Sequence, residues 1–60
     1  MSDEVDIRNL AFSIQAMRDK ITRNRGGIPN YELDRYLRAI EDACIEAANY
    51  IAKSDKHRYG

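Results

Sequence analysis

The chain is short and carries no net charge. Its 60 residues are 43% hydrophobic and 33% charged, and ten Lys and Arg residues balance ten Asp and Glu residues. This length allows a single domain with a marginal core, and the composition is too apolar for a disordered segment. The lack of a basic excess argues against binding to bulk nucleic acid.

The first residues and the cysteine content indicate a cytoplasmic protein. The chain opens with the acidic pair Asp3 and Glu4, whereas a signal peptide opens with basic residues. No apolar run approaches the roughly 18 residues that a membrane span needs. The single cysteine, Cys44, has no partner within the chain for a disulfide, which is typical of a reducing compartment. We therefore expect no membrane association.

Residues 4–25 are expected to form the first helix. They contain neither glycine nor proline, and their apolar side chains recur at intervals of three and four residues. These side chains form one stripe: Ile7, Leu10, Ile14, Met17 and Ile21. Basic residues gather in the last two turns: Arg18, Lys20, Arg23 and Arg25. They can compensate the helix dipole or, with the amides of the following glycines, form a phosphate-binding patch.

Residues 26–30 are expected to form the turn of a hairpin. Gly26 and Gly27 supply left-handed conformations for a helix C-cap, and Pro29 biases its neighbours out of the helix. Asn30 is the predicted N-cap of a second helix. This helix is expected over residues 31–54, followed by a frayed tail over residues 55–60.

The second helix carries two apolar stripes. One of them comprises Leu33, Leu37, Ile40, Cys44, Ala47 and Ile51. Its neighbour comprises Tyr36, Ile40, Ala43, Ala47 and Tyr50. One stripe can pack on the first helix, which leaves the other for another chain. A single seam between two helices hardly offsets the ordering entropy of about 1.5 kcal/mol per residue. We therefore predict an all-α fold, an antiparallel helical hairpin that assembles into a symmetric oligomeric helical bundle, a dimeric four-helix bundle at minimum.

Catalytic and metal-binding arrangements are not evident. The one histidine, His57, lies in the predicted tail, and Cys44 lies in an apolar stripe, where a thiol usually acts as a small hydrophobic group. The acidic residues Glu41 and Asp42 follow Arg38 at helical spacing and are expected to pair with it on a solvated face. We expect no enzyme, no metal and no cofactor.

Aromatic and basic residues are paired along the chain. Tyr31 precedes Arg35 by four residues, and Phe12 follows Arg8 by four. A tyrosine beside an arginine can stack a nucleobase while the guanidinium holds its phosphate. The alternative is that these tyrosines are interface residues of the oligomer, with their rings buried and their hydroxyls at the rim.

The second helix resembles the helical hairpin of phage anti-CBASS and anti-Thoeris sponge proteins. The resemblance covers residues 31–53: the segment YELDRYLRAIEDA, the following Ala47, and the ending Ile51-Ala52-Lys53. Glu46 stands where the family usually has tryptophan, and Tyr31 where it often has arginine. The resemblance implies a multimer without enzymatic activity, located in the host cell cytoplasm if the chain is phage-encoded. Such a protein sequesters the cyclic di- or trinucleotides, or the cyclic ADP-ribose signals, of bacterial defence systems.

A sponge of this kind would hold phosphates with arginines near the hairpin end and stack a base on a nearby tyrosine. The candidate ligand-binding residues are Arg25, Tyr31, Arg35 and Arg38, with Arg23 as an alternate phosphate donor. The competing function is an oligomeric helical-hairpin module that binds a helix of a partner protein. A small nucleic-acid-binding accessory protein is a third alternative, disfavoured by the zero net charge.

Overall fold

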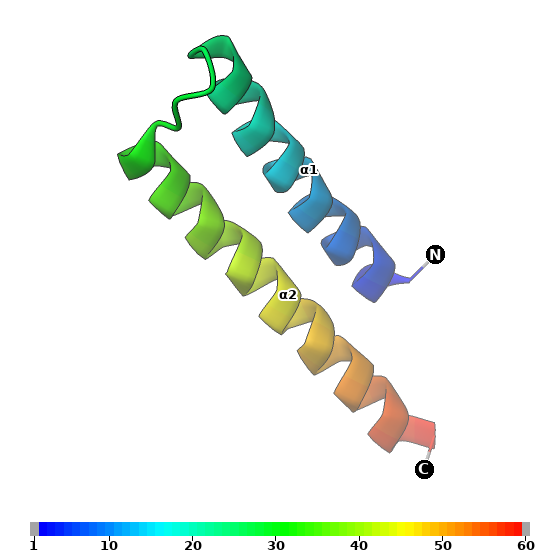
Figure 1. Ribbon diagram of the computed structural model, residues 1–60. Helices are drawn as coiled ribbons and strands as arrows, with labels where there is room; N and C mark the ends of the chain where they lie inside the picture. Colours follow the sequence, from blue (N-terminus) through cyan, green and yellow to red (C-terminus); the bar gives the residue numbers. More distant parts are fainter. Residues whose placement is uncertain (1, 60) are drawn as a thin grey trace.

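The chain forms two antiparallel helices that lie side by side (Figure 1). The computed structural model describes the backbone of residues 2–59 and the side chains of residues 2–54. Helix α1 spans Asp3–Asn24 and helix α2 spans Tyr31–Tyr59. The predicted all-α hairpin is therefore confirmed. Neither helix, over the described residues, combines the length and the hydropathy that crossing a membrane requires.

The turn follows the glycine pair. Gly26 and Gly27 have φ values of 70° and 89°, in the left-handed region expected of them. The amide of Gly27 donates to the carbonyl of Thr22 at 2.9 Å, and the amide of Gly26 donates to the carbonyl of Arg23 at 3.1 Å. These two bonds make a Schellman motif, which satisfies carbonyls that the end of α1 would otherwise leave unpaired.

Helix α2 begins at the predicted cap and continues further than expected. The amide of Leu33 donates to Oδ1 of Asn30 at 3.2 Å, so Asn30 is the N-cap. The helix continues to Tyr59, beyond the predicted end at residue 54, so the backbone of residues 55–59 is helical. No glycine or proline interrupts the sequence between residues 31 and 59, which removes any strong signal for an earlier end. Gly60 lies outside the described residues.

The seam between the helices buries few side chains, and two of its three buried residues are alanines. Ala11, Ile14 and Ala48 are its buried residues, and Ala48 has an exposed fraction of 0%. The predicted stripe of α1 only partly faces α2, because Leu10 and Met17 are 53% and 52% exposed. Ala11 and Arg18 lie at the seam in their place. The helix is thus rotated about its axis relative to the prediction.

Candidate functional site

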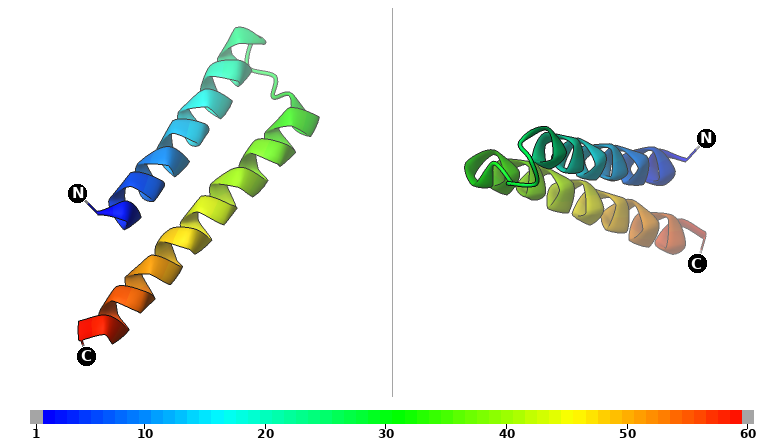
Figure 2. Two further views of the ribbon diagram at one scale, coloured as in Figure 1. Left: turned by 180° about the vertical axis from the view of Figure 1, so that it is seen from behind. Right: turned by 45° about the horizontal axis from the view of Figure 1, so that its top comes forward.

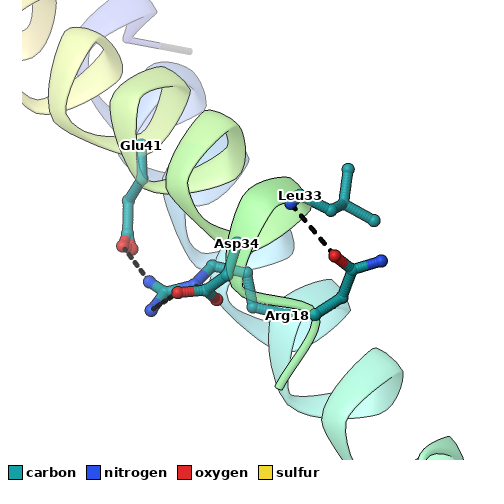
Figure 3. A network of polar contacts seen from close by, with 5 residues as sticks. Arg18, Leu33, Asp34 and Glu41 are labelled. Atoms are coloured by element: carbon teal, nitrogen blue, oxygen red, sulfur yellow. Dashed lines mark hydrogen bonds and ion pairs between the residues drawn. The ribbon is translucent and has the colours of Figure 1, made fainter.

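An ion-pair cluster fixes the two helices against each other near the turn. Nε of Arg18 on α1 donates to Oδ1 of Asp34 on α2 at 2.7 Å, and Nη2 approaches Oδ2 of the same carboxylate at 3.4 Å. Nη1 of Arg18 donates to Oε1 of Glu41, which lies about two turns further along α2, also at 3.4 Å. Figure 3 shows the guanidinium between the two carboxylates. A fork-shaped cation contacting two acids from the facing helix favours one register of α1 against α2.

This cluster corrects two predictions about charged residues. Glu41 pairs with Arg18 across the seam, and not with Arg38 on its own helix. Arg18 therefore does not belong with a phosphate-binding patch, because both of its edges already face carboxylates. The hydrogen bond to Asp34 raises the pKa of Arg18 above its ordinary value. The second oxygen of Glu41, Oε2, is buried and has no hydrogen-bond partner among the described residues.

A second polar contact ties the other end of the hairpin. Nε of Arg8 donates to Oε2 of Glu4 at 3.0 Å, and Nη2 of Arg8 donates to Oδ1 of Asn49 on α2 at 3.1 Å. The Arg8 guanidinium is thus shared between its own helix and the facing one. The sequence predicted that Arg8 pairs with Phe12 to stack a base. In the structure, the Arg8 guanidinium bonds instead to Glu4 and to Asn49 of the facing helix.

Three of the five predicted ligand-binding residues meet at one surface hollow. Tyr31, Arg35 and Arg38 lie on one side of the first turns of α2 and line a hollow of about 370 Å³. The shared face follows from their spacing of four and three residues along a helix. The remaining lining residues come from the same helix: Asp34, Ala39 and Asp42. Tyr31 is 75% exposed, so one face of its ring is open to a ligand.

The other two predicted residues lie at the end of α1, outside the lining of this hollow. Arg25 is the C-cap residue, and its Nε donates to the carbonyl of Ile28 at 3.1 Å. This bond closes the turn and uses one edge of the guanidinium. Arg23 is exposed in the last turn of α1, where its charge suits the helix dipole.

The electrostatics of the hollow favour an anion only moderately. The charge of Asp34 is offset by its pair with Arg18, which leaves the guanidinium groups of Arg35 and Arg38 opposite the single carboxylate of Asp42. The guanidinium carbon of Arg35 lies 5.6 Å from the centroid of the Tyr36 ring, a cation–π distance. The hollow itself offers two cationic donors, the exposed ring of Tyr31 as an aromatic platform, and Asp42 as an acceptor for a ligand N–H or O–H group.

A second hollow, of about 260 Å³, lies between the helices and was not anticipated. Its lining comes from both helices: Arg8, Ala11, Phe12, Gln15, Glu41 and Ile45. Glu41 also belongs to the ion-pair cluster around Arg18, and one signal for that cluster was present in the sequence. Arg18 follows Ile14 by four residues and Ala11 by seven, so it occupies the register of a buried stripe. A charged residue in that register indicates a partner charge on the facing helix.

The described side chains do not assemble a metal or nucleophile site. No group of three His, Cys, Asp or Glu side chains within residues 2–54 is placed to hold a metal ion. Cys44 is half-buried at the seam, and the side chain of His57 lies outside the described residues. Comparison with protein-family models, with curated proteins and with solved structures gives no match.

Proposed function

We propose that this chain is a phage immune-evasion protein that binds and sequesters a cyclic nucleotide messenger of bacterial defence. The observation that carries the proposal is the hollow at the start of α2, where Tyr31, Arg35 and Arg38 meet. The resemblance of residues 31–53 to the anti-CBASS and anti-Thoeris sponge hairpins points to the same helix. Sequestration needs affinity and no reacting group, which agrees with the side chains present in this hollow.

The three residues have complementary roles in this proposal. The Tyr31 ring stacks on a base, an interaction worth about 1–3 kcal/mol for nucleic-acid bases. Arg35 and Arg38 donate to phosphate oxygens, and each charge-assisted hydrogen bond contributes about 1.5–3 kcal/mol. Asp42 accepts from an exocyclic amine or a ribose hydroxyl. The volume of the hollow, about 370 Å³, lies at the lower end of the range for small-molecule sites, about 300–1,000 Å³.

A symmetric homo-oligomer completes the proposal. The hollow is open on one side in a single hairpin, because every residue that lines it belongs to α2. A cyclic messenger with two or three nucleotide units carries more surface than one such hollow covers. A second subunit that approaches α2 would enclose the rest of the ligand and exclude water from the phosphate contacts.

Calorimetric titration tests the proposal directly. Wild-type protein is titrated with cyclic dinucleotides, cyclic trinucleotides and cyclic ADP-ribose isomers, and binding of at least one is expected. Arg38→Ala should lower the affinity roughly tenfold to a hundredfold. Lys53→Ala removes a positive charge from the same helix outside the hollow and should leave the affinity unchanged. No heat from any messenger would overturn the proposal.

A tyrosine pair provides the matched control for stacking. Tyr31 and Tyr50 lie on the same helix and are exposed to nearly the same degree, 75% and 72%. Tyr31→Ala should weaken binding, Tyr31→Phe should retain it, and Tyr50→Ala should have no effect. Equal losses from the Tyr31 and Tyr50 variants would place the ligand elsewhere on α2.

The second candidate is an oligomeric helical-hairpin module that binds a partner protein helix. The observation in its favour is the number of large apolar side chains left exposed by the hairpin, among them Leu10, Met17 and Ile40. A helix laid against such a surface would bury them at spacings of three and four residues. This module would give no heat with any nucleotide of the panel.

A further inference from the structure

The hairpin by itself is a single layer of two helices. Its principal extents are 50 × 20 × 10 Å, and Figure 2 shows the two helices side by side in a single layer. Domains normally consist of at least two packed layers around a shared core. Here the buried apolar residues of the described chain are only Ala11, Ile14 and Ala48. One layer leaves both of its broad faces open.

The accessible surface is larger than a compact chain of this mass would have. The hairpin exposes 5008 Å². A compact monomer of 6.9 kDa exposes about 4,000 Å². The excess of about 1,000 Å² is close to the roughly 800 Å² that each partner contributes to a standard protein interface. The unpartnered area is therefore of the size that a second copy would cover.

The two broad faces differ in chemistry. Phe12 and Ile45 line the hollow between the helices, so they share one face with the polar side chains of Arg8 and Glu41. Each helix has one further flank beside its buried stripe, and these two flanks must share the opposite face. We call this opposite face the apolar face. Its large exposed members are Leu10, Met17, Leu33, Tyr36 and Ile40.

The central part of the apolar face, from Leu10 to Met17 on α1 and from Leu33 to Ala47 on α2, has no charged residue in its register. Charges lie at its margins: Asp3 precedes Leu10 by seven residues, and the Arg35 guanidinium lies 5.6 Å from the Tyr36 ring. The intervening positions on α2 are taken by small residues: Ala43, Cys44 and Ala47. The ion pairs of the hairpin lie at the seam and toward the other face, around Arg8 and Arg18. Because the central part of this face has no charged residue, a symmetric contact there brings no like charges together at its centre. Small residues between large ones allow a second pair of helices to approach closely.

We infer that the apolar face is the surface through which two copies of this chain associate face to face, forming a four-helix bundle. The two-fold arrangement buries the same side chains from both copies, with Ile40 and Met17 in the central part of the contact. This inference goes beyond the proposed function, because the subunit that would enclose a bound messenger approaches a different side of α2. The hollow lined by Tyr31, Arg35 and Arg38 lies on another side of α2 and stays open in the dimer.

Sedimentation equilibrium of paired isoleucine variants, without any nucleotide, tests the inference. Ile40 and Ile45 are on one helix and have similar exposed fractions, 49% and 40%, but lie on opposite faces. Ile40→Glu places an unpaired charge in the contact and should weaken dimerisation roughly a hundredfold or more. Ile45→Glu should leave the dimer constant within about threefold. A monomeric wild type, or dissociation by Ile45→Glu alone, would overturn the inference.

Cross-linking keeps the test decisive if Ile40→Glu fails to fold. In a Cys44→Ala background, the single-cysteine variants Ile40→Cys and Asp42→Cys are treated with a short bismaleimide. Asp42 lines the hollow on the other side of α2, so only Ile40→Cys should yield a covalent dimer. Cross-linking of Asp42→Cys without Ile40→Cys would show that copies meet through a different face. Because no ligand is present, failure here is distinct from failure of messenger binding.

Discussion

The tightest point of the hairpin is Ala48, and enlarging it should separate the helices. Its exposed fraction is 0%, and it lies on α2 where that helix contacts α1. Leucine adds three carbon atoms at a position that solvent does not reach. Overpacking of this kind costs about 1–3 kcal/mol of unfolding free energy. The hairpin has few other buried contacts with which to absorb the displacement.

The matched control is Ala39→Leu on the same helix. Ala39 is exposed, and leucine differs from alanine in helix propensity by only a few tenths of a kcal/mol. The two variants should therefore differ by about 2 kcal/mol. For a domain of this size such a difference lowers Tm by about 8–16 °C. Thermal unfolding followed by circular dichroism, at one fixed protein concentration, measures it. Equal Tm values for the two variants would refute the close contact at Ala48.

Three further predictions concern the turn, the cap and the ion pairs. Gly27→Ala should lower the free energy of unfolding by about 1 kcal/mol or more, because φ is 89° there and L-alanine is strained in that region. Nothing lies within 4 Å of an added Cβ, so the loss comes from the backbone alone, and a synthetic chain with D-alanine at this position should restore the stability. Asn30→Ala should cost about 1 kcal/mol and Asn30→Asp should not, as measured by urea unfolding, since the cap bond to Leu33 is kept by a carboxylate. Arg18→Met should lower the free energy of unfolding, because it leaves the carboxylates of Asp34 and Glu41 unpaired at the seam. Adding Asp34→Asn and Glu41→Gln to the Arg18→Met protein should recover part of the loss, and a thermodynamic cycle that treats the two acids as one unit measures the coupling.

The hairpin could be predicted from local signals because each of them acts over a few residues. The glycine pair places the turn, Asn30 places the start of α2, and the spacing of apolar residues gives helices on either side. The shared face of Tyr31, Arg35 and Arg38 follows in the same way from the helical repeat. The end of α2 was missed because no residue before Gly60 is a strong stop signal.

The rotation of α1 about its axis could not be read from spacing alone. Two stripes are nearly equivalent in the sequence, one through Leu10 and Met17 and one through Ala11 and Arg18. Long-range contacts decide between them: alanines let the helices approach, and Arg18 finds Asp34 on the facing helix. Local periodicity carries no information about a partner 16 residues away. The role of Arg25 was missed for another reason: its bond to the carbonyl of Ile28, three residues further on, depends on the conformation of the turn and not on residue spacing.

Sequestration can be measured most directly as removal of an intact messenger from solution. Each cyclic nucleotide of the panel is mixed with excess protein, the free fraction is separated by ultrafiltration, and the bound fraction is released by heat and identified by mass spectrometry. The account predicts that one messenger disappears from the filtrate and is recovered chemically unchanged, and that Arg38→Ala protein leaves it in the filtrate. Undiminished free messenger across the panel, or recovery of a linearised product, would contradict a binding protein that acts by sequestration.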